Sequence, residues 1–371
     1  MEINKDNEGV SIIIPTFNER KNIIALIEKI KYEFKDYLLE IIVVDDNSSD
    51  GTGITIKNLS REDNRIRLIP RLGRIGLSSA IKEGLIAAKY EIGGVIDGDG
   101  QVDPSDLKIA ICNLAKYSFD IVVGSRFLYK SKRSGLSPKR EFASSAANYL
   151  CRLSLPKKYS HITDYQSICM GINLKTCMPL IYKVDVNGFK FFYELLSLSK
   201  SKLKISDVPL NFQPRIYGNS KLDLAIVWDF LTQLIHIFTS RLIPKRAVSF
   251  GLVGIIGSLI QLLSTKILMT IFIFDFTKSL YISVYLSATS NYLINNSLTF
   301  KNSRLFGANL FKGLLKYMVV ISLPLLANIG LATIIYKEIN NNTFTAQIAG
   351  IVVVFVWHYV ASSRFVWNNP I

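Results

Sequence analysis

The second half of this 371-residue chain carries very few charged residues, and this feature restricts the possible folds more than any other. Residues 222–371 contain 11 Lys/Arg and 4 Asp/Glu, which is half the average charge density of the chain, whereas residues 1–221 contain 33 and 25. This composition excludes a disordered chain, a collagen-like chain and a small disulfide-stabilised fold. It predicts a soluble domain followed by membrane segments.

Four stretches of the second half are apolar over the roughly 20 residues needed to cross a bilayer. They are residues 247–274, 279–300, 317–336 and 344–363. Two basic residues, Lys278 and Lys337, flank one side of this arrangement, and eight flank the other: Arg241, Lys245, Arg246, Lys301, Arg304, Lys312, Lys316 and Arg364. Because Lys and Arg collect on the cytoplasmic side of membrane proteins, the sequence predicts a multi-pass protein whose soluble half is cytoplasmic.

Residues 222–245 connect the two halves and have the pattern of an amphipathic helix. Polar residues such as Asp229 and Gln233 fall on one arc at helical spacing, and Val227 and Leu231 lie opposite. We interpret this segment as a helix in the membrane surface. The alternative is an ordinary amphipathic helix that packs on the soluble domain.

Apolar runs of strand length alternate with helical periodicity in the first half. The expected strands are residues 10–14, 40–44, 65–69, 93–96 and 120–123, and the expected helices are 19–34, 52–59, 77–89 and 104–116. This alternation predicts an α/β domain with a mostly parallel, Rossmann-like sheet. Ligands of such sheets bind beyond the carboxyl ends of the strands.

Polar motifs follow three of these strands: PTFNE (15–19), DDNSSDGT (45–52) and DGDGQ (97–101). Each one alone could also be a helix cap, and this alternative stays open for Asp50. Together, at successive strand ends, they predict a binding site. Two aspartates two residues apart suit a hard divalent cation that bridges a diphosphate. Neither the dinucleotide fingerprint nor a Walker A motif is found, so a sugar nucleotide fits better than nicotinamide or ATP.

The motifs PTFNE, VVDDNSSDGT, DGDGQVDP and VGSRF, in this order and spacing, resemble family 2 glycosyltransferases of GT-A fold. The resemblance is strongest to dolichol-phosphate mannose synthases and their bacterial polyprenyl-phosphate relatives, and it covers about residues 9–221. The tail from Arg246, RAVSFGLVG, resembles the GtrA-like membrane domain. The implied domains are a GT-A domain (1–221), an interfacial helix and linker (222–245) and a transmembrane domain (246–371).

The resemblance also implies the residues that bind the donor. These are Pro15, Phe17, Glu19, Val44, Asp46, Asp97, Gly98, Asp99, Gln101, Arg126, Arg215 and Lys221. Among them, Asp99 and Gln101 match the ligands of a Mg²⁺ or Mn²⁺ ion. In two places the chain departs from the family. Ser78 stands where a glycine is usual, and residues 164–169 read DYQSIC at a place where relatives usually read Ser-Gly-Phe.

Three positions match those offered to the phosphate of the acceptor: Arg126, which also stands among the donor residues, Arg140 and Ser144. The catalytic group implied by the family is Asp99, Arg126 and Arg140. A lipid monophosphate is already anionic at pH 7, so it can attack the anomeric carbon without a general base. It then needs cations that offset the repulsion between two phosphate groups.

The resemblance therefore implies inverting transfer of a hexose, with mannose from GDP-mannose as the default, to dolichyl or polyprenyl phosphate. Membrane lipid is the expected partner of the basic surface, because no nucleic-acid-binding motif is present. Three alternatives stay open: a UDP-glucose-dependent enzyme, a processive polysaccharide synthase and a non-catalytic sugar-lipid carrier. The chain lacks the Gln-x-x-Arg-Trp motif of the processive class, and the intact DGDGQ argues against a carrier.

Overall fold

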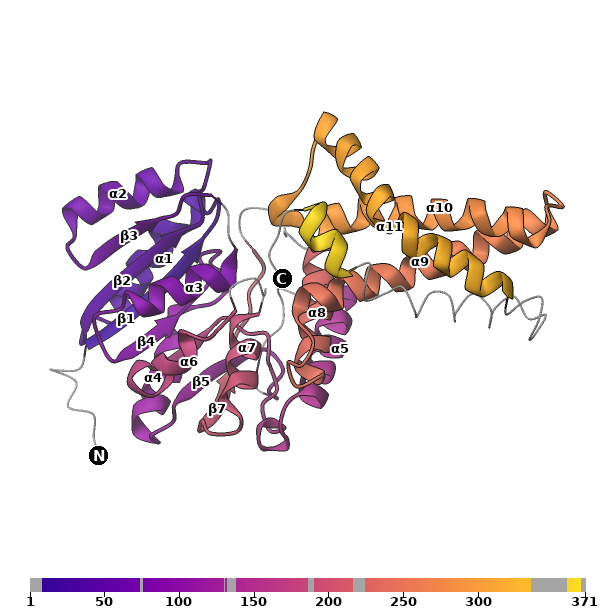
Figure 1. Cartoon of the computed structure of the whole chain (residues 1–371). Helices are drawn as coiled ribbons and strands as arrows, with labels where there is room; N and C mark the ends of the chain where they lie inside the picture. Colours follow the sequence, from indigo (N-terminus) through magenta and orange to yellow (C-terminus); the bar gives the residue numbers. More distant parts are fainter. Residues whose placement is uncertain are drawn as a thin grey trace. The chain divides into compact units, whose positions relative to one another are not determined.

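The structure is a computed structural model, and it describes residues 9–73, 76–129, 131, 138–185, 190–215, 224–334 and 359–367. Contacts within the chain divide it into two compact units, Met1–Phe238 and Thr239–Ile371 (Figure 1). We call them the N-terminal and the C-terminal unit.

The N-terminal unit is built on a seven-stranded sheet with the order β3-β2-β1-β4-β6-β5-β7. The strands are β1 (Gly9–Thr16), β2 (Leu38–Asp45), β3 (Ile66–Pro70), β4 (Ile92–Val95), β5 (Ile121–Ser125), β6 (Met170–Asn173) and β7 (Ile205–Pro209). All neighbours are parallel except β6, which runs antiparallel to β4 and β5. The predicted mostly parallel α/β sheet is confirmed.

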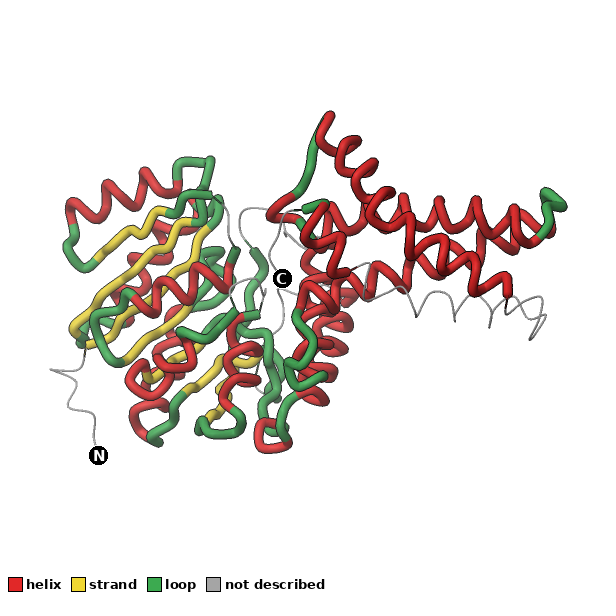
Figure 2. Tube along the Cα trace, in the orientation of Figure 1, coloured by secondary structure: helices red, strands yellow, loops and turns green. Residues whose placement is uncertain are grey.

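Helices lie along both faces of this sheet (Figure 2). The helices of the N-terminal unit are α1 (Arg20–Glu33), α2 (Thr52–Glu62), α3 (Leu77–Ile86), α4 (Pro104–Lys116), α5 (Pro138–Ser154), α6 (Leu174–Ile181), α7 (Phe191–Ser199) and α8 (Leu224–Phe238), of which α5 and α8 pack against each other. Successive side chains of a strand point to opposite faces. Accordingly Ile12 and Ile14 of β1 belong to one apolar core, and Ile13 belongs to the other.

Helix α8 packs on the N-terminal unit, but its polar side faces inward. The Gln233 side chain is buried and donates from Nε2 to Oε2 of the buried Glu194 on α7 (2.9 Å). Val227, Leu231 and Phe238 remain exposed. The polar Gln233 side chain faces the protein because the buried carboxylate of Glu194 on the neighbouring helix takes its amide as the partner. The membrane-surface location of residues 222–245 stays a prediction.

The C-terminal unit contains α9 (Lys245–Thr270), α10 (Phe276–Ile294) and α11 (Ala308–Ile334). Helices α9 and α10 pack closely: Ser287 donates to the Gly257 carbonyl (2.7 Å), and a Cβ at Gly257 would lie 2.3 Å from the Asn291 amide. Within the part of the chain that the structure describes, only α9 is long and apolar enough to cross a membrane.

The prediction of four spans therefore stays a prediction. Helix α10 covers most of the second predicted span, but it is rich in Ser and Thr, which reduces its hydropathy. Helix α11 covers most of the third. The fourth, residues 344–363, lies outside the described residues except for its last five.

Candidate active site

The ends of β1 and β2 bring the first two polar motifs together. The register pairs Thr16 with Asp45, and the Thr16 hydroxyl donates to Asp45 (3.2 Å). Asp45 also accepts hydrogen bonds from the backbone and the hydroxyl of Ser48, so it shapes the turn after β2. Asp50 accepts from the backbone N–H groups of Arg20 and Thr52, at 3.0 and 2.9 Å, at the start of α1 and α2. Asp50 thus bonds the first N–H group of each helix, although the N-cap residues of these helices, Glu19 and Gly51, make no side-chain cap.

Asp46 is buried and fixes the segment that leads into α3. One carboxylate oxygen pairs with Nη1 of Arg71 (2.8 Å), and the other accepts from the Gly76 N–H (2.9 Å). Gly76 has a φ of +112°, a backbone conformation that favours glycine. A contact of Asp46 with the donor, as the family resemblance implies, would use a carboxylate already held in place by Arg71.

Other positions implied for the donor lie around the same strand ends. Glu19 is buried and accepts from Nδ2 of Asn22 (2.8 Å). Pro15 is the β1 partner of Val44. The Val44 side chain belongs to the apolar core, and its strand is paired on both edges, with β1 and with β3. Phe17 lies partly exposed just after β1.

An acidic cluster follows β4 and contains Asp97, Asp99 and Glu19. Burial, together with the negative charges of Asp99 and Glu19, raises the pKa of Asp97 well above its usual value. Gly98 between the two aspartates has no room for a side chain, because a Cβ there would lie 2.8 Å from Cγ2 of Thr16. The cluster therefore concentrates negative charge at the edge of the sheet where β1 and β4 end.

Arg215 reaches this cluster from the segment after β7. Its Nη2 lies 2.5 Å from Oδ2 of the buried Asp99. The other Asp99 oxygen accepts from the backbone N–H of Gln101 (3.0 Å), and Nε2 of Gln101 donates to the Gln213 carbonyl (2.8 Å). The bond to Gln213 uses the amide nitrogen of Gln101 and not its oxygen, and this oxygen is the atom that would bind the predicted metal.

The residues at this site supply only some of the ligands that a divalent cation needs. No group of three or more His, Cys, Asp or Glu side chains that could hold a metal occurs among the residues the structure describes. Asp99 and Gln101 offer a carboxylate and an amide oxygen, which are hard ligands of the type that Mg²⁺ takes. The negative charges of Asp97 and Glu19 lie close to this pair and also favour a cation here. The remaining ligands would have to come from a bound diphosphate.

Arg126 is held by a carboxylate that the sequence analysis did not identify. Its Nε and Nη2 bond the two oxygens of Asp164 at 2.7 and 3.0 Å. The exposed fractions of the two side chains are 14% and 0%. The guanidinium also lies over the rings of Phe127 and Phe212, at 5.5 and 5.6 Å from their centroids. Asp164 stands at the start of DYQSIC, and only its departure from the family pattern had drawn attention to it.

The loop around Asp164 links three elements of the N-terminal unit. Thr163 donates from its backbone and its hydroxyl to Asp207 of β7, at 2.9 and 2.6 Å. The Tyr165 N–H donates to Asn148 of α5 (3.0 Å). The same loop therefore positions both Arg126 and the helix that carries Arg140 and Ser144.

Arg140 and Ser144, the two remaining residues implied for the acceptor phosphate, both lie on helix α5. Arg140 is exposed and Ser144 partly exposed, one turn apart near the start of the helix. The apolar residues of α5 do not form a buried face. Phe142 is 77% exposed, and Tyr149 and Leu153 are also exposed, whereas Asn148 and Cys151 face inward. Lys221, the last cation implied by the family, lies outside the described residues.

A second charged residue that the sequence analysis did not identify is Lys190, which is partly exposed. Lys190 precedes the first turn of α7, and its pKa is lowered to about 8 by burial and by the positive charge of Arg126, while Asp164 and Asp97 act in the opposite direction. Its ammonium group is therefore within electrostatic reach of both the Arg126–Asp164 pair and the acidic cluster. Only a single lysine in an apolar stretch, GFKFF, marks it in the sequence.

Comparisons with known proteins agree with the two units. Residues 11–177 match the glycosyl transferase family 2 model, and residues 249–367 match the GtrA/DPMS transmembrane domain. The dolichol-phosphate mannosyltransferase of Pyrococcus furiosus is 29% identical over 96% of this chain and 99% of its own. That of Mycosarcoma maydis is 30% identical over 68% and 84%, and a dodecaprenyl-phosphate galacturonate synthase of Rhizobium johnstonii is 26% identical over 68% and 74%.

Among solved structures, glucosyl-3-phosphoglycerate synthase from Mycobacterium tuberculosis overlaps with a TM-score of 0.47 and 19% identity, over 63% of this chain and 80% of that one. The sequence relationships are stronger: one relative is matched over almost the full length of both chains, and another reaches 30% identity over most of its length. The chain therefore belongs to glycosyltransferase family 2, among the dolichol-phosphate mannosyltransferases and related enzymes, here with a C-terminal GtrA-like membrane domain.

Proposed function

We propose that this enzyme transfers a hexose from a nucleotide sugar to a polyprenyl phosphate, with inversion, to give a β-linked lipid-phosphate sugar. One observation carries the proposal: the acidic cluster after β4 and the arginine that Asp164 holds after β5 lie at the same edge of the sheet, where ligands of such folds bind. The relatives support it, because their names share a polyprenyl-type phosphate acceptor although they differ in the sugar.

On the donor side, Asp99 and Gln101 would hold a Mg²⁺ or Mn²⁺ ion. Such an ion, when bound, stabilises the negative charge that develops on the departing nucleoside diphosphate. Arg215 lies against Asp99 and is placed to contact the same phosphates. Glu19, Asp46 and the backbone around Val44 would surround the base and ribose. GDP-mannose is our preferred donor, with UDP-glucose as the alternative.

On the acceptor side, Arg126 and the exposed residues of α5 would bind the lipid phosphate. A phosphate monoester is already anionic at pH 7, so no general base is needed to activate it. The cations would offset the repulsion between the phosphate groups of the acceptor and the donor. The exposed apolar residues of α5 and α8, two helices that pack side by side, support a position at the membrane surface. We also propose that the N-terminal unit is cytoplasmic and that the four apolar stretches span the membrane.

A donor screen tests this function. Membranes containing the enzyme are incubated with radiolabelled GDP-mannose or UDP-glucose, Mg²⁺ and a short polyprenyl phosphate. With one of the two donors, we expect label to enter a product that is extracted into organic solvent. This product should carry one sugar per lipid. Polymeric product would instead indicate a processive synthase, and no product with any nucleotide sugar would indicate a non-catalytic carrier.

Arg140 provides a test of the acceptor side. If Arg140 binds the lipid phosphate, Arg140→Ala removes a charge-assisted hydrogen bond worth about 1.5–3 kcal/mol, so the KM for the acceptor should rise at least about tenfold. Arg140→Lys should restore only part of this, because a lysine cannot reproduce the two-pronged guanidinium contact. Acceptor and donor dependence are measured separately; an unchanged acceptor KM, or an equal loss on the donor side, would refute this role.

A further inference from the structure

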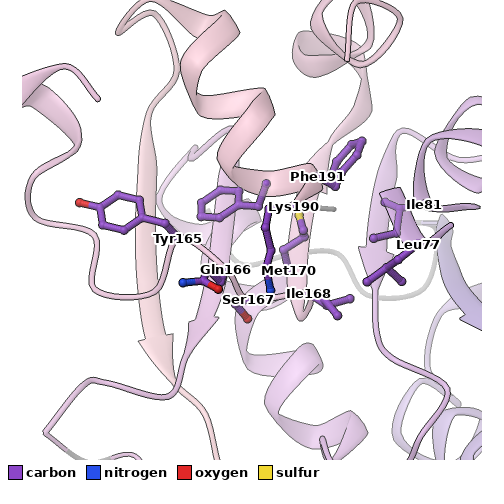
Figure 3. A pocket seen from close by; sticks show the side chains of 10 residues that line it. Leu77, Ile81, Tyr165, Gln166, Ser167, Ile168, Met170, Lys190 and Phe191 are labelled. Atoms are coloured by element: carbon purple, nitrogen blue, oxygen red, sulfur yellow. The ribbon is translucent and has the colours of Figure 1, made fainter. Parts of the chain in front are cut away.

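The pocket of the N-terminal unit shown in Figure 3 lies before α7 and is too small for a sugar or a nucleotide. Its volume is about 10 Å³, which is room for about one water molecule. The substrates therefore have to be held by side chains around the strand ends, and whatever fixes these side chains affects the reaction. One segment, residues 210–215 after β7, lies against candidate residues for both substrates.

On the metal side, this segment pairs with the loop that carries Gln101. The N–H of Gln213 donates to the Gln101 carbonyl (2.9 Å), and Nε2 of Gln101 donates to the Gln213 carbonyl (2.8 Å). Because the second bond fixes the amide by its nitrogen, it also fixes the direction of the amide oxygen, the candidate metal ligand. At the end of the segment, Arg215 bonds Asp99 (2.5 Å). Groups that orient metal ligands in this way influence metal affinity.

On the acceptor side, the same segment lies against Arg126. The Phe212 backbone forms an antiparallel bridge with Val102, next to Gln101. Its ring centroid lies 5.6 Å from the Arg126 guanidinium, and such a ring attracts a cation over its face. Residues 210–215 thus join the arginine implied for the acceptor phosphate to the residues implied for the metal.

Asp106 of α4 ties this segment down. Its side chain is buried, and one carboxylate oxygen accepts from the Asn211 N–H (3.0 Å) while the other accepts from Nδ2 of the Asn211 side chain (3.3 Å). The N–H of Leu210 donates to the Ser125 carbonyl at the end of β5 (2.9 Å). Neither Asp106 nor Asn211 is among the residues that the family resemblance implies for a substrate.

The two bonds to Asn211 fix the register of the segment. An extended chain advances about 3.3 Å per residue, so a slip by one residue would place another side chain opposite Asp106. It would also move the Phe212 ring away from Arg126 and the Arg215 guanidinium away from Asp99. Because a buried carboxylate is costly unless it is hydrogen-bonded, the register that keeps both bonds is strongly preferred.

We propose that Asp106 and Asn211 are positioning residues, which hold residues 210–215 in register and so place the Gln101 amide, Arg215 and the Phe212 ring. This inference rests on the proposed function and concerns how its two halves are aligned. It predicts a joint effect on metal binding and on the use of the acceptor.

The test measures Mn²⁺ binding and acceptor dependence on the same variants. Full-length enzyme in lipid nanodiscs is titrated with Mn²⁺ in the presence of GDP or UDP, and free Mn²⁺ is read by electron paramagnetic resonance well below the unfolding temperature. Asn211→Ala removes the Nδ2 bond and leaves the backbone bond to Asp106. We expect the Mn²⁺ dissociation constant to rise at least about tenfold and the KM for the acceptor at least about threefold.

Asp106→Asn is the conservative variant. The new amide oxygen can still accept from the Asn211 N–H, and the new amide nitrogen can donate to the Asn211 side chain once that amide turns over. Both constants should therefore return to within about threefold of the wild type. Asp106→Ala removes both bonds and should have a larger effect than Asn211→Ala. If Asp106→Ala does not fold, Asn211→Ala and Asp106→Asn still decide.

Ser11→Ala is the matched control at the opposite edge of the sheet. Ser11 lies near the start of β1 and donates to the buried carboxylate of Glu40 (2.5 Å), which also accepts from the Lys89 N–H (2.8 Å). This variant also removes a side-chain donor and leaves a backbone donor. It should lower thermal stability without changing Mn²⁺ binding or the KM for the acceptor.

Two outcomes would overturn the inference. Asn211→Ala with lower stability but unchanged Mn²⁺ binding and acceptor KM would show that the pair serves only the fold. Equal losses in Ser11→Ala would show that general destabilisation causes the effect. A wild type that transfers no sugar to lipid would refute the proposed function itself, whereas an active wild type with unresponsive variants would refute only the role of Asp106 and Asn211.

Discussion

Asp99→Asn should lower turnover by at least about a hundredfold, and a chelator should abolish wild-type activity until Mg²⁺ or Mn²⁺ is restored. The substitution replaces a carboxylate by a neutral amide at the residue where Arg215 and the proposed metal both bind. The metal would then be held more weakly, and the departing diphosphate would lose much of its electrostatic stabilisation. Steady-state rates measured over a range of metal concentrations separate the two effects, because weaker metal binding is partly overcome by excess metal.

Asp103→Asn is the matched control for this experiment. Asp103 lies four residues further on and caps α4, where it accepts from the Ser105 N–H (3.0 Å). Its replacement should cost about 1 kcal/mol of stability or less and leave the metal requirement unchanged. Full activity of the wild type in chelator would eliminate the metal from the proposed reaction.

Asp164→Ala should lower the free energy of unfolding by about 3–5 kcal/mol, as expected when one partner of a buried ion pair is removed. Turnover should fall by about two orders of magnitude, because the Arg126 guanidinium loses both bonds that orient it. Chemical denaturation and steady-state kinetics on the same preparations give the two numbers. Asp164→Asn should keep part of the stability, since one oxygen can still accept from Arg126.

A double variant separates the fold from the chemistry. Arg126→Met combined with Asp164→Leu removes both charges, and such replacements of buried pairs are often neutral or stabilising. We expect stability to recover while activity stays low. The Arg65–Asp63 pair is the control, because it has the same two-bond geometry, at 2.9 and 2.7 Å, on a more exposed arginine. Asp63→Ala should cost about 1 kcal/mol or less and not affect turnover; recovered activity in the double variant would show that Arg126 is structural.

The sequence predicts the elements that are locally encoded and misses those defined by distant partners. β1 and β2 are mostly apolar runs buried on both faces, and such runs predict strands without knowledge of their neighbours. β6 has four residues and β7 has an interrupted burial pattern, so neither stands out. Their place in the sheet depends on pairing with β4 and β5, which lie far away in the chain.

The candidate site divides in the same way. The acidic motifs at the ends of β1, β2 and β4 follow from local pattern and sheet topology. The pairs Arg215–Asp99 and Arg126–Asp164 join residues 116 and 38 positions apart, and no spacing rule relates them. Helix α8 shows the same limit, since its amphipathic pattern is real, but which side faces the protein was decided by Glu194 on another helix.

The antiparallel pairing of β5 with β6 has a consequence for how such an enzyme can diversify. Residues 126–169 leave the sheet at the end of one strand and return on its neighbour, and Arg126 and Asp164 join near the two ends of this excursion. The segment behaves as a closed insertion whose anchor points are fixed independently of what lies between them. With the acceptor role that we propose for α5, substitutions within this helix would change the lipid that is accepted while the nucleotide half of the sheet keeps its geometry. The two substrate preferences could then evolve separately.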